Sequence, residues 1–199
     1  VPVISDACQA LGVFNGDYTC NSFQAIKQIT TGDGGMLVVN NRLDYKKAKL
    51  MRWFGIDREK KGKNYKEREM TFDIEVMGYK RQMNDITAGM GIAGLKVYDK
   101  VIAYRKRLFD LYKRLLKVPV IGGDTYWLCT ILLENRDKVA KKLFNNGVET
   151  NLVHIRNDAF KIFGGKVKLP NMDWVESRYL CLPLNMRVTE DNVIFISNL

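Results

Sequence analysis

The chain of 199 residues carries 32 lysine and arginine residues against 22 aspartate and glutamate residues, a formal net charge of +10. With 46% hydrophobic residues it can bury a sizeable core, as one domain or slightly more than one. No apolar run reaches the roughly 18–20 residues of a membrane span, and no charged-then-apolar leader opens the chain. These features argue against a membrane partner, and we expect a soluble, cytoplasmic protein.

The four cysteines, Cys8, Cys20, Cys129 and Cys181, are widely spaced and form no Cys-x-x-Cys pair. His154 is the only histidine, so we expect no zinc site and predict no metal. A chain of this size does not need a disulfide framework, and free thiols in a reducing compartment are expected.

Basic residues concentrate in two runs. Residues 41–70 hold eleven lysines and arginines against five acidic residues, and residues 96–117 hold eight against two. A nucleic-acid footprint is one interpretation. However, acidic residues interrupt the first run and no known nucleic-acid motif accompanies either one. A solvated basic face is favoured, and it would also suit an anionic substrate such as a nucleotide-linked sugar.

The first third of the chain reads as short strands joined by turns. Residues 3–5 form an apolar strand that ends at Asp6, and in open α/β sheets ligands bind at the carboxyl ends of strands. Residues 18–25 and 35–40 are two further predicted strands, separated by a segment with one lysine and a Gly-rich turn.

Two helices are predicted next. Residues 41–54 place apolar side chains near one face, and Gly55 ends that helix. Residues 56–71 are polar and charged and read as a loop. Asn84 or Asp85 can cap a long helix that runs to about residue 117. Each glycine in its first part costs roughly 1 kcal/mol relative to alanine, so their number predicts close packing there.

The remainder reads as a small α/β unit, and we place the domain transition near Pro119. The predicted domains are therefore residues 1–117 and 118–199, both of the α/β class. In the second domain the predicted strands are residues 126–133, 148–153 and 181–182. The predicted helices are one from Asn135 to residues 145–147, a short one at 174–180 and a terminal one capped by Thr189.

The lysine segment runs from Ser22 to Gly35, and its lysine, Lys27, is the one charged residue in the run from Asn21 to Gly32. A lysine between apolar neighbours loses solvation, which lowers the pKa of its amine and makes it a usable nucleophile and proton carrier. Taken alone, a hairpin with one solvated lysine is the simpler interpretation.

Three separated segments together resemble the sugar aminotransferases of the DegT family, which are pyridoxal-phosphate enzymes of fold type I. They are Ile4–Gly12, Ser22–Gly35 and Gly78–Asp85, and residues 52–58 and 182–184 fit as well. Ser-Phe-x-x-x-Lys alone is a weak signal, but followed by Thr-Thr-Gly-Asp-Gly-Gly and preceded by Asp-Ala-Cys-Gln-Ala-Leu-Gly it is strong. The resemblance implies part of the large cofactor-binding domain followed by a small C-terminal α/β domain.

The resemblance assigns roles to four residues. Lys27 matches the lysine that holds the cofactor covalently and then moves a proton. Asp6 matches the carboxylate that pairs with the pyridine nitrogen and keeps it protonated. Gln9 matches a residue near the ring and its 3-hydroxyl, and Ser22 matches a phosphate-binding hydroxyl.

Family members act as homodimers in which the partner chain completes each phosphate site, so a shared active site is implied. The matching stretch here begins at Tyr79, and Lys80 or Gln82 is the candidate ligand, although many members carry other residues at both positions. His154 and Arg156 match a small-domain loop that faces the sugar.

Complete family members are about twice as long and place a Gly-Thr phosphate turn before the segment that opens this chain. Because the chain begins at Val1, we expect a fragment or processed product without that portion. The leading hypothesis is an aminotransferase that moves an amino group from glutamate to a nucleotide-linked keto-sugar. Lys27 supports it, since relatives that dehydrate carry histidine there.

Two alternatives stay open. One is a truncated, non-catalytic relative that serves as a dimerisation or binding module, motivated by the missing N-terminal portion. The other is a basic nucleic-acid-binding module, which rests only on the net charge of +10.

Overall fold

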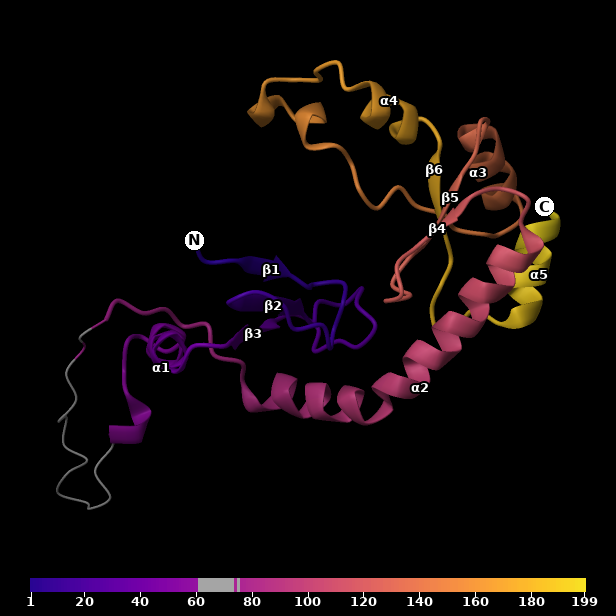
Figure 1. Cartoon of the computed structure of the whole chain (residues 1–199). Helices are drawn as coiled ribbons and strands as arrows, with labels where there is room; N and C mark the ends of the chain where they lie inside the picture. Colours follow the sequence, from indigo (N-terminus) through magenta and orange to yellow (C-terminus); the bar gives the residue numbers. More distant parts are fainter. Residues whose placement is uncertain (61–73, 75) are drawn as a thin grey trace. The chain divides into compact units, whose positions relative to one another are not determined.

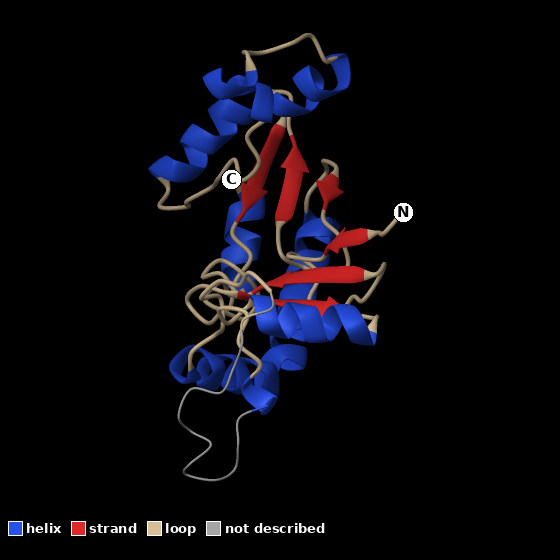
Figure 2. Cartoon of the chain, turned by 90° about the vertical axis from the view of Figure 1, so that its left-hand side faces the viewer, coloured by secondary structure: helices blue, strands red, loops and turns tan. Residues whose placement is uncertain are grey.

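A computed structural model describes residues 1–60, 74 and 76–199 of the chain (Figure 1). The chain consists of two compact units, Val1–Lys96 and Val97–Leu199. The division falls within one long helix, α2 (Asp85–Leu115). Strands and helices occur in both units, which confirms the predicted α/β class; Figure 2 shows the helices in blue and the strands in red.

The first unit contains a three-stranded sheet of order β1-β2-β3: β1 (Ile4–Asp6), β2 (Tyr18–Ser22) and β3 (Gly35–Val39). β1 pairs with β2 in parallel, with Asp6 opposite Cys20, and β2 pairs with β3 in antiparallel fashion. The carboxyl ends of β1 and β2 and the start of β3 therefore share one sheet edge. The predicted strand 18–25 stops at residue 22, because the chain turns there into the lysine segment.

Helix α1 (Arg42–Met51) follows β3 and is capped by the side chain of Asn41, which accepts the N–H groups of the first turn. It is shorter than predicted: Phe54 and Gly55 take left-handed backbone angles, with φ of 54° and 77°, which ends helical geometry. A short 3-10 turn, η1 (Arg58–Lys60), comes next, and residues 61–71 of the predicted loop lie outside the described residues.

The second unit contains an antiparallel sheet of order β4-β5-β6 with helices around it. Its core centres on Leu108 and Tyr112 of α2, which pack with Cys129, Leu180 and Val193. Its elements are β4 (Val120–Ile121), β5 (Cys129–Leu132), α3 (Arg136–Asn145), η3 (Asn157–Ala159), η4 (Lys161–Phe163), α4 (Pro170–Glu176), β6 (Tyr179–Leu182) and α5 (Glu190–Asn198).

Two sequence predictions in this unit are wrong. Residues 148–153 form no strand; they contribute only an isolated bridge between Asn151 and Cys181. The predicted helix 174–180 lies earlier, at 170–176, because Pro170 suits the first helical turn and all four residues of β6 are buried as a strand. The terminal helix begins after Thr189 as predicted, with a reciprocal capping box to Asn192.

The described part of the first unit buries few apolar side chains. Ala7, Phe23 and Ile29 are its buried hydrophobic residues, whereas Ile4 in β1 is 71% exposed. Among the described residues, no helix has the length and apolarity to cross a membrane. All four cysteines are free.

Candidate functional site

Asp6 ends β1 at the sheet edge. Its Oδ1 atom accepts the backbone N–H of Cys8 at 3.0 Å. Hydrogen bonding to Cys8, first from the side chain and then from the backbone, lowers the pKa of the Asp6 carboxyl, and the positive charge of Lys27 adds to this. Asp6 is therefore an anion at neutral pH, and it lies at the carboxyl end of β1.

The contact with Asp6 also changes the pKa of Cys8, a residue for which the sequence predicted no role at the site. Its hydrogen bond with Asp6, together with burial and the charge of Asp6, raises the pKa of the Cys8 thiol to about 11, while Lys27 acts in the opposite direction. The thiol also lies 3.7 Å from the carbonyl oxygen of Cys20. A neutral thiol thus stands beside an ionised carboxylate.

Lys27 lies in the loop that joins β2 to β3. The loop is closed at its base: the N–H of Phe23 donates to Gly34 O, the N–H of Thr31 donates to Phe23 O, both at 2.9 Å, and the Thr30 hydroxyl donates to Phe23 O at 3.0 Å. Lys27 is half-buried near its tip. These bonds hold the lysine backbone at the edge where Asp6 ends its strand.

Gln28 connects this loop to the turn after β1. Its side chain is buried, and its Nε2 atom donates to the carbonyl oxygen of Gln9 at 3.0 Å. The Gln9 side chain itself is exposed, so its predicted contact with a cofactor ring stays a prediction.

Two glycines of α2 pack against the same loop. A Cβ atom at Gly91 would lie 3.2 Å from Cγ2 of Thr31, and one at Gly94 would lie 3.2 Å from Cβ of Ile29. Both distances are shorter than ordinary van der Waals contact, so a larger residue would push the loop away, which confirms the predicted close packing at these two positions. Gly89 has open space around it.

Ser22 is the last residue of β2 and pairs with Gly35 across the sheet. Its Oγ atom accepts the N–H of Gln24 at 3.3 Å. Asp6, Ser22 and the Lys27 loop therefore belong to one edge of one sheet, although they come from separate stretches of sequence.

Gln82 belongs to the stretch before α2, and that stretch is tied to the end of α1. The backbone of Lys80 forms an isolated antiparallel β-bridge with Trp53, and the N–H of Arg81 donates to Arg52 O at 2.8 Å. Gln82 lines a hollow of about 190 Å³ together with cationic side chains for which the sequence predicted no role. They are Lys49, Arg52 and Arg58, and the carboxylates of Asp57 and Glu59 line the same hollow, with Glu59 paired to Lys49.

His154 and Arg156 lie in the second unit. The His154 ring is 5.9 Å from that of Trp127. Arg156 is buried, and its guanidinium donates to Asp158, Asp173 and the carbonyl oxygen of Val167. Arg156 thus ties η3 to α4, and this geometry lends no support to its predicted substrate contact, which stays a prediction, as does that of His154.

A lysine in a closed loop beside an ionised aspartate, at the carboxyl edge of an α/β sheet, is the arrangement expected of a pyridoxal-phosphate enzyme. The profile of the DegT/DnrJ/EryC1/StrS aminotransferase family matches residues 1–198, and the chain belongs to this family. Pyridoxal phosphate is the cofactor of its aminotransferases.

Two curated relatives illustrate the similarity. The chain is 28% identical to GDP-perosamine synthase of Escherichia coli O157:H7, covering 94% of the chain and 51% of the relative. It is also 28% identical to dTDP-4-dehydro-2,3,6-trideoxy-D-glucose 4-aminotransferase of Saccharopolyspora spinosa, covering 92% of the chain and 51% of the relative. The chain therefore spans about half the length of these relatives.

A solved structure of a sugar aminotransferase is also similar to this chain. The sugar aminotransferase CalS13 from Micromonospora echinospora superposes with a TM-score of 0.84 at 25% identity, over 98% of this chain and 57% of that one. This confirms the predicted fold class, a partial fold type I aminotransferase. The boundary of the predicted domains at residue 117 stays a prediction.

The residues present fit the cofactor by their chemistry. A protonated pyridine nitrogen requires an anionic acceptor, which Asp6 provides. An aldehyde requires an amine, which Lys27 carries, and a phosphate requires donors, of which the Ser22 hydroxyl is one. All three belong to the same sheet edge.

Proposed function

We propose that this chain is part of a pyridoxal-phosphate-dependent aminotransferase that transfers an amino group, from glutamate, to a nucleotide-linked keto-sugar in sugar or polysaccharide biosynthesis. The observation that carries the proposal is the closed loop that holds Lys27 at the sheet edge where the ionised Asp6 ends β1. The two named relatives, one a GDP-sugar synthase and one a dTDP-sugar aminotransferase, support the substrate class.

Each residue has a task in this mechanism. The cofactor, when bound, supplies the electron-withdrawing ring that makes amino transfer possible. Lys27 would hold the cofactor through Nζ, and the same Nζ would hold and move the transferred proton. The Asp6 carboxylate would accept a hydrogen bond from the ring nitrogen and orient the ring. Gln9 would contact the ring, and the Ser22 hydroxyl would donate to the phosphate.

The remaining assignments concern partners. We place a second copy of the protein against the stretch that contains Gln82, as a homodimer with shared active sites. Arg52 and Arg58 beside Gln82 support an anion at that hollow, because guanidinium groups suit phosphate oxygens; the carboxylates of Asp57 and Glu59 also line it, and Glu59 pairs with Lys49. We assign His154 to the sugar side of the site and the protein to the cytoplasm.

The test traps the cofactor on its lysine. The protein is incubated with pyridoxal phosphate, reduced with borohydride and digested, and the modified peptide is located by mass spectrometry. We expect the adduct on Lys27, its loss in Lys27→Arg, and its retention in Lys106→Arg, a control lysine that is paired with Asp110. An adduct spread evenly over surface lysines would contradict the proposal.

A second candidate function is a non-catalytic dimerisation or binding module. The chain spans about half of its relatives' length, and the activity of these 199 residues by themselves is the point on which the two candidates differ. Amination of a panel of keto-sugar nucleotides with glutamate separates the two: turnover by the protein supports the enzyme, and cofactor trapping without any turnover supports the module.

A further inference from the structure

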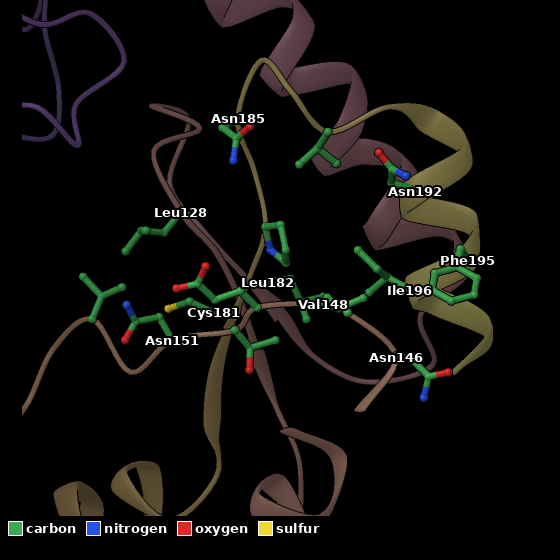
Figure 3. A pocket seen from close by; sticks show the side chains of 16 residues that line it. Leu128, Asn146, Val148, Asn151, Cys181, Leu182, Asn185, Asn192, Phe195 and Ile196 are labelled. Carbon is green, nitrogen blue, oxygen red and sulfur yellow. The ribbon is translucent and has the colours of Figure 1, made fainter. Parts of the chain in front are cut away.

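A cavity of about 560 Å³ in the second unit has no part in the function proposed above. It is formed by residues 146–153, by β6 with the turn that follows it, and by α5 (Figure 3). Its volume falls within the roughly 300–1,000 Å³ of small-molecule sites. None of the predicted cofactor or substrate residues lines it.

The floor of the cavity is apolar and held by the core. Val148, Leu182 and Ile196 are buried there, and Figure 3 shows all three turned toward the cavity. The adjoining turn is fixed from α2, because the Tyr112 hydroxyl donates to Pro183 O at 3.1 Å and the Tyr104 hydroxyl donates to Val188 O at 2.8 Å. A preformed floor binds a ligand without the cost of ordering it.

Three asparagines on the cavity wall, Asn151, Asn185 and Asn192, share one orientation. In each, Oδ1 accepts a backbone N–H, and because that group can only donate, the amide oxygen must face it. The three donors are the N–H groups of Leu152 at 2.7 Å, Arg187 at 2.8 Å and Thr189 at 2.9 Å. Within the described part of the chain no protein acceptor is recorded for the three amide NH₂ groups, so each can donate to a ligand.

The charge of the lining limits the ligand. Glu149 is the one charged side chain among the described residues of the wall, in a chain of net charge +10. A phosphate or carboxylate would meet the Glu149 carboxylate with no cation to offset it. The wall therefore offers NH₂ donors and one anionic acceptor over an apolar floor.

From this arrangement we infer that the cavity binds a neutral pyranose ring. Sugar hydroxyls accept hydrogen bonds from the amides of Asn151 and Asn185 and donate to Glu149, while the apolar C–H face of the ring covers Val148 and Leu182. The inference is independent of the cofactor residues, and it adds a saccharide site to this chain.

The first experiment measures binding to the 199-residue protein by saturation-transfer NMR. The probes are the methyl α-pyranosides of glucose, galactose and mannose, with glucose 1-phosphate as the charged comparison. We expect saturation transfer to at least one methyl pyranoside and weaker or no transfer to the phosphate. No transfer to any methyl pyranoside, or stronger binding of the phosphate, overturns the inference.

The second experiment uses variants that keep the backbone cap. Asn151→Asp and Asn185→Asp retain the oxygen that accepts the backbone N–H and replace the donor with a second oxygen. A sugar hydroxyl that accepts from the amide would have to turn and donate to the new carboxylate, which disrupts its other hydrogen bonds, and we expect about fivefold weaker binding for each. Asn171→Asp on α4 adds the same charge away from the cavity and should bind as the parent does. Equal affinity in all four proteins, each checked for folding by circular dichroism, overturns the site.

Discussion

The side-chain amide of Gln28 donates to the main-chain carbonyl of Gln9 at 3.0 Å, and this bond fastens the Lys27 loop to the turn after β1. The two residues are 19 positions apart. The amide is buried while its carbonyl partner belongs to the turn that follows Asp6, so one hydrogen bond sets the lysine loop against the aspartate strand.

Removing this bond should loosen the loop. In Gln28→Leu the apolar side chain keeps the volume but leaves Gln9 O without its donor, and we expect a loss of about 1–2 kcal/mol in the free energy of unfolding. Urea denaturation measures it, and the yield of the borohydride-trapped cofactor on Lys27 should fall as well. Unchanged stability together with an unchanged yield would show that the bond does not position the loop.

Gly89 and Gly94 of α2 provide a matched pair of substitutions. Gly89→Ala places a methyl group in open space within a helix and should stabilise the protein by about 0.5–1 kcal/mol. Gly94→Ala places it 3.2 Å from the buried Ile29 side chain, which cannot easily move, and overpacking opposes the helix gain. We expect Gly94→Ala to be less stable than Gly89→Ala by about 1–3 kcal/mol, measured by urea unfolding. Equal stability would mean that the loop is not packed on the helix.

The sequence predicted what depends on neighbours along the chain. Asn84 could be named as a cap because its side chain needs only the N–H group three residues on, and the structure has Thr87 N–H at 3.0 Å from its Oδ1. Asp6 could be placed at a strand end because an apolar run stops there. The lysine loop followed from its flanking strands and Gly-rich turn.

Contacts between distant residues could not be predicted in the same way. Tyr179 and Leu180 were predicted to end a helix. They belong to β6 instead, because pairing with β5 buries all four residues of that strand. The local sequence pattern likewise does not predict that Arg156 forms ion pairs with Asp158 and with Asp173 of α4. The Gln9–Gln28 bond also depends on tertiary structure alone, and so does the identity of the loop that packs against Gly94.

Cys8 should be a poor nucleophile because of Asp6. With its pKa raised to about 11 from an ordinary 9.0, only about 1% of the thiol is ionised at pH 9, against about half in a protein without the shift. Asp6→Asn removes the negative charge while its amide oxygen can still accept the N–H of Cys8, so Cys8 alkylation by iodoacetamide at pH 9 should become faster. Mass spectrometry of each cysteine gives the rate, with Cys20 as the internal reference. An equal acceleration at both cysteines would indicate unfolding instead.

The Arg156 network should govern stability in acid. Hydrogen bonding with Arg156 lowers the pKa of Asp158 from 3.8 to about 2, so the folded state favours the ionised carboxylate. A depressed folded-state pKa contributes stability that is complete above the ordinary value and is lost as the pH falls through the folded value. Thermal melts of the parent should therefore drop between pH 4 and pH 2, and Asp158→Asn should be less stable at pH 6 but flatter across that interval. The comparison protein is Asp124→Asn, whose carboxylate lies outside this network, and it should follow the parent. A parent-like acid profile in Asp158→Asn would assign the acid sensitivity to other carboxylates and remove Asp158 as the group that Arg156 stabilises.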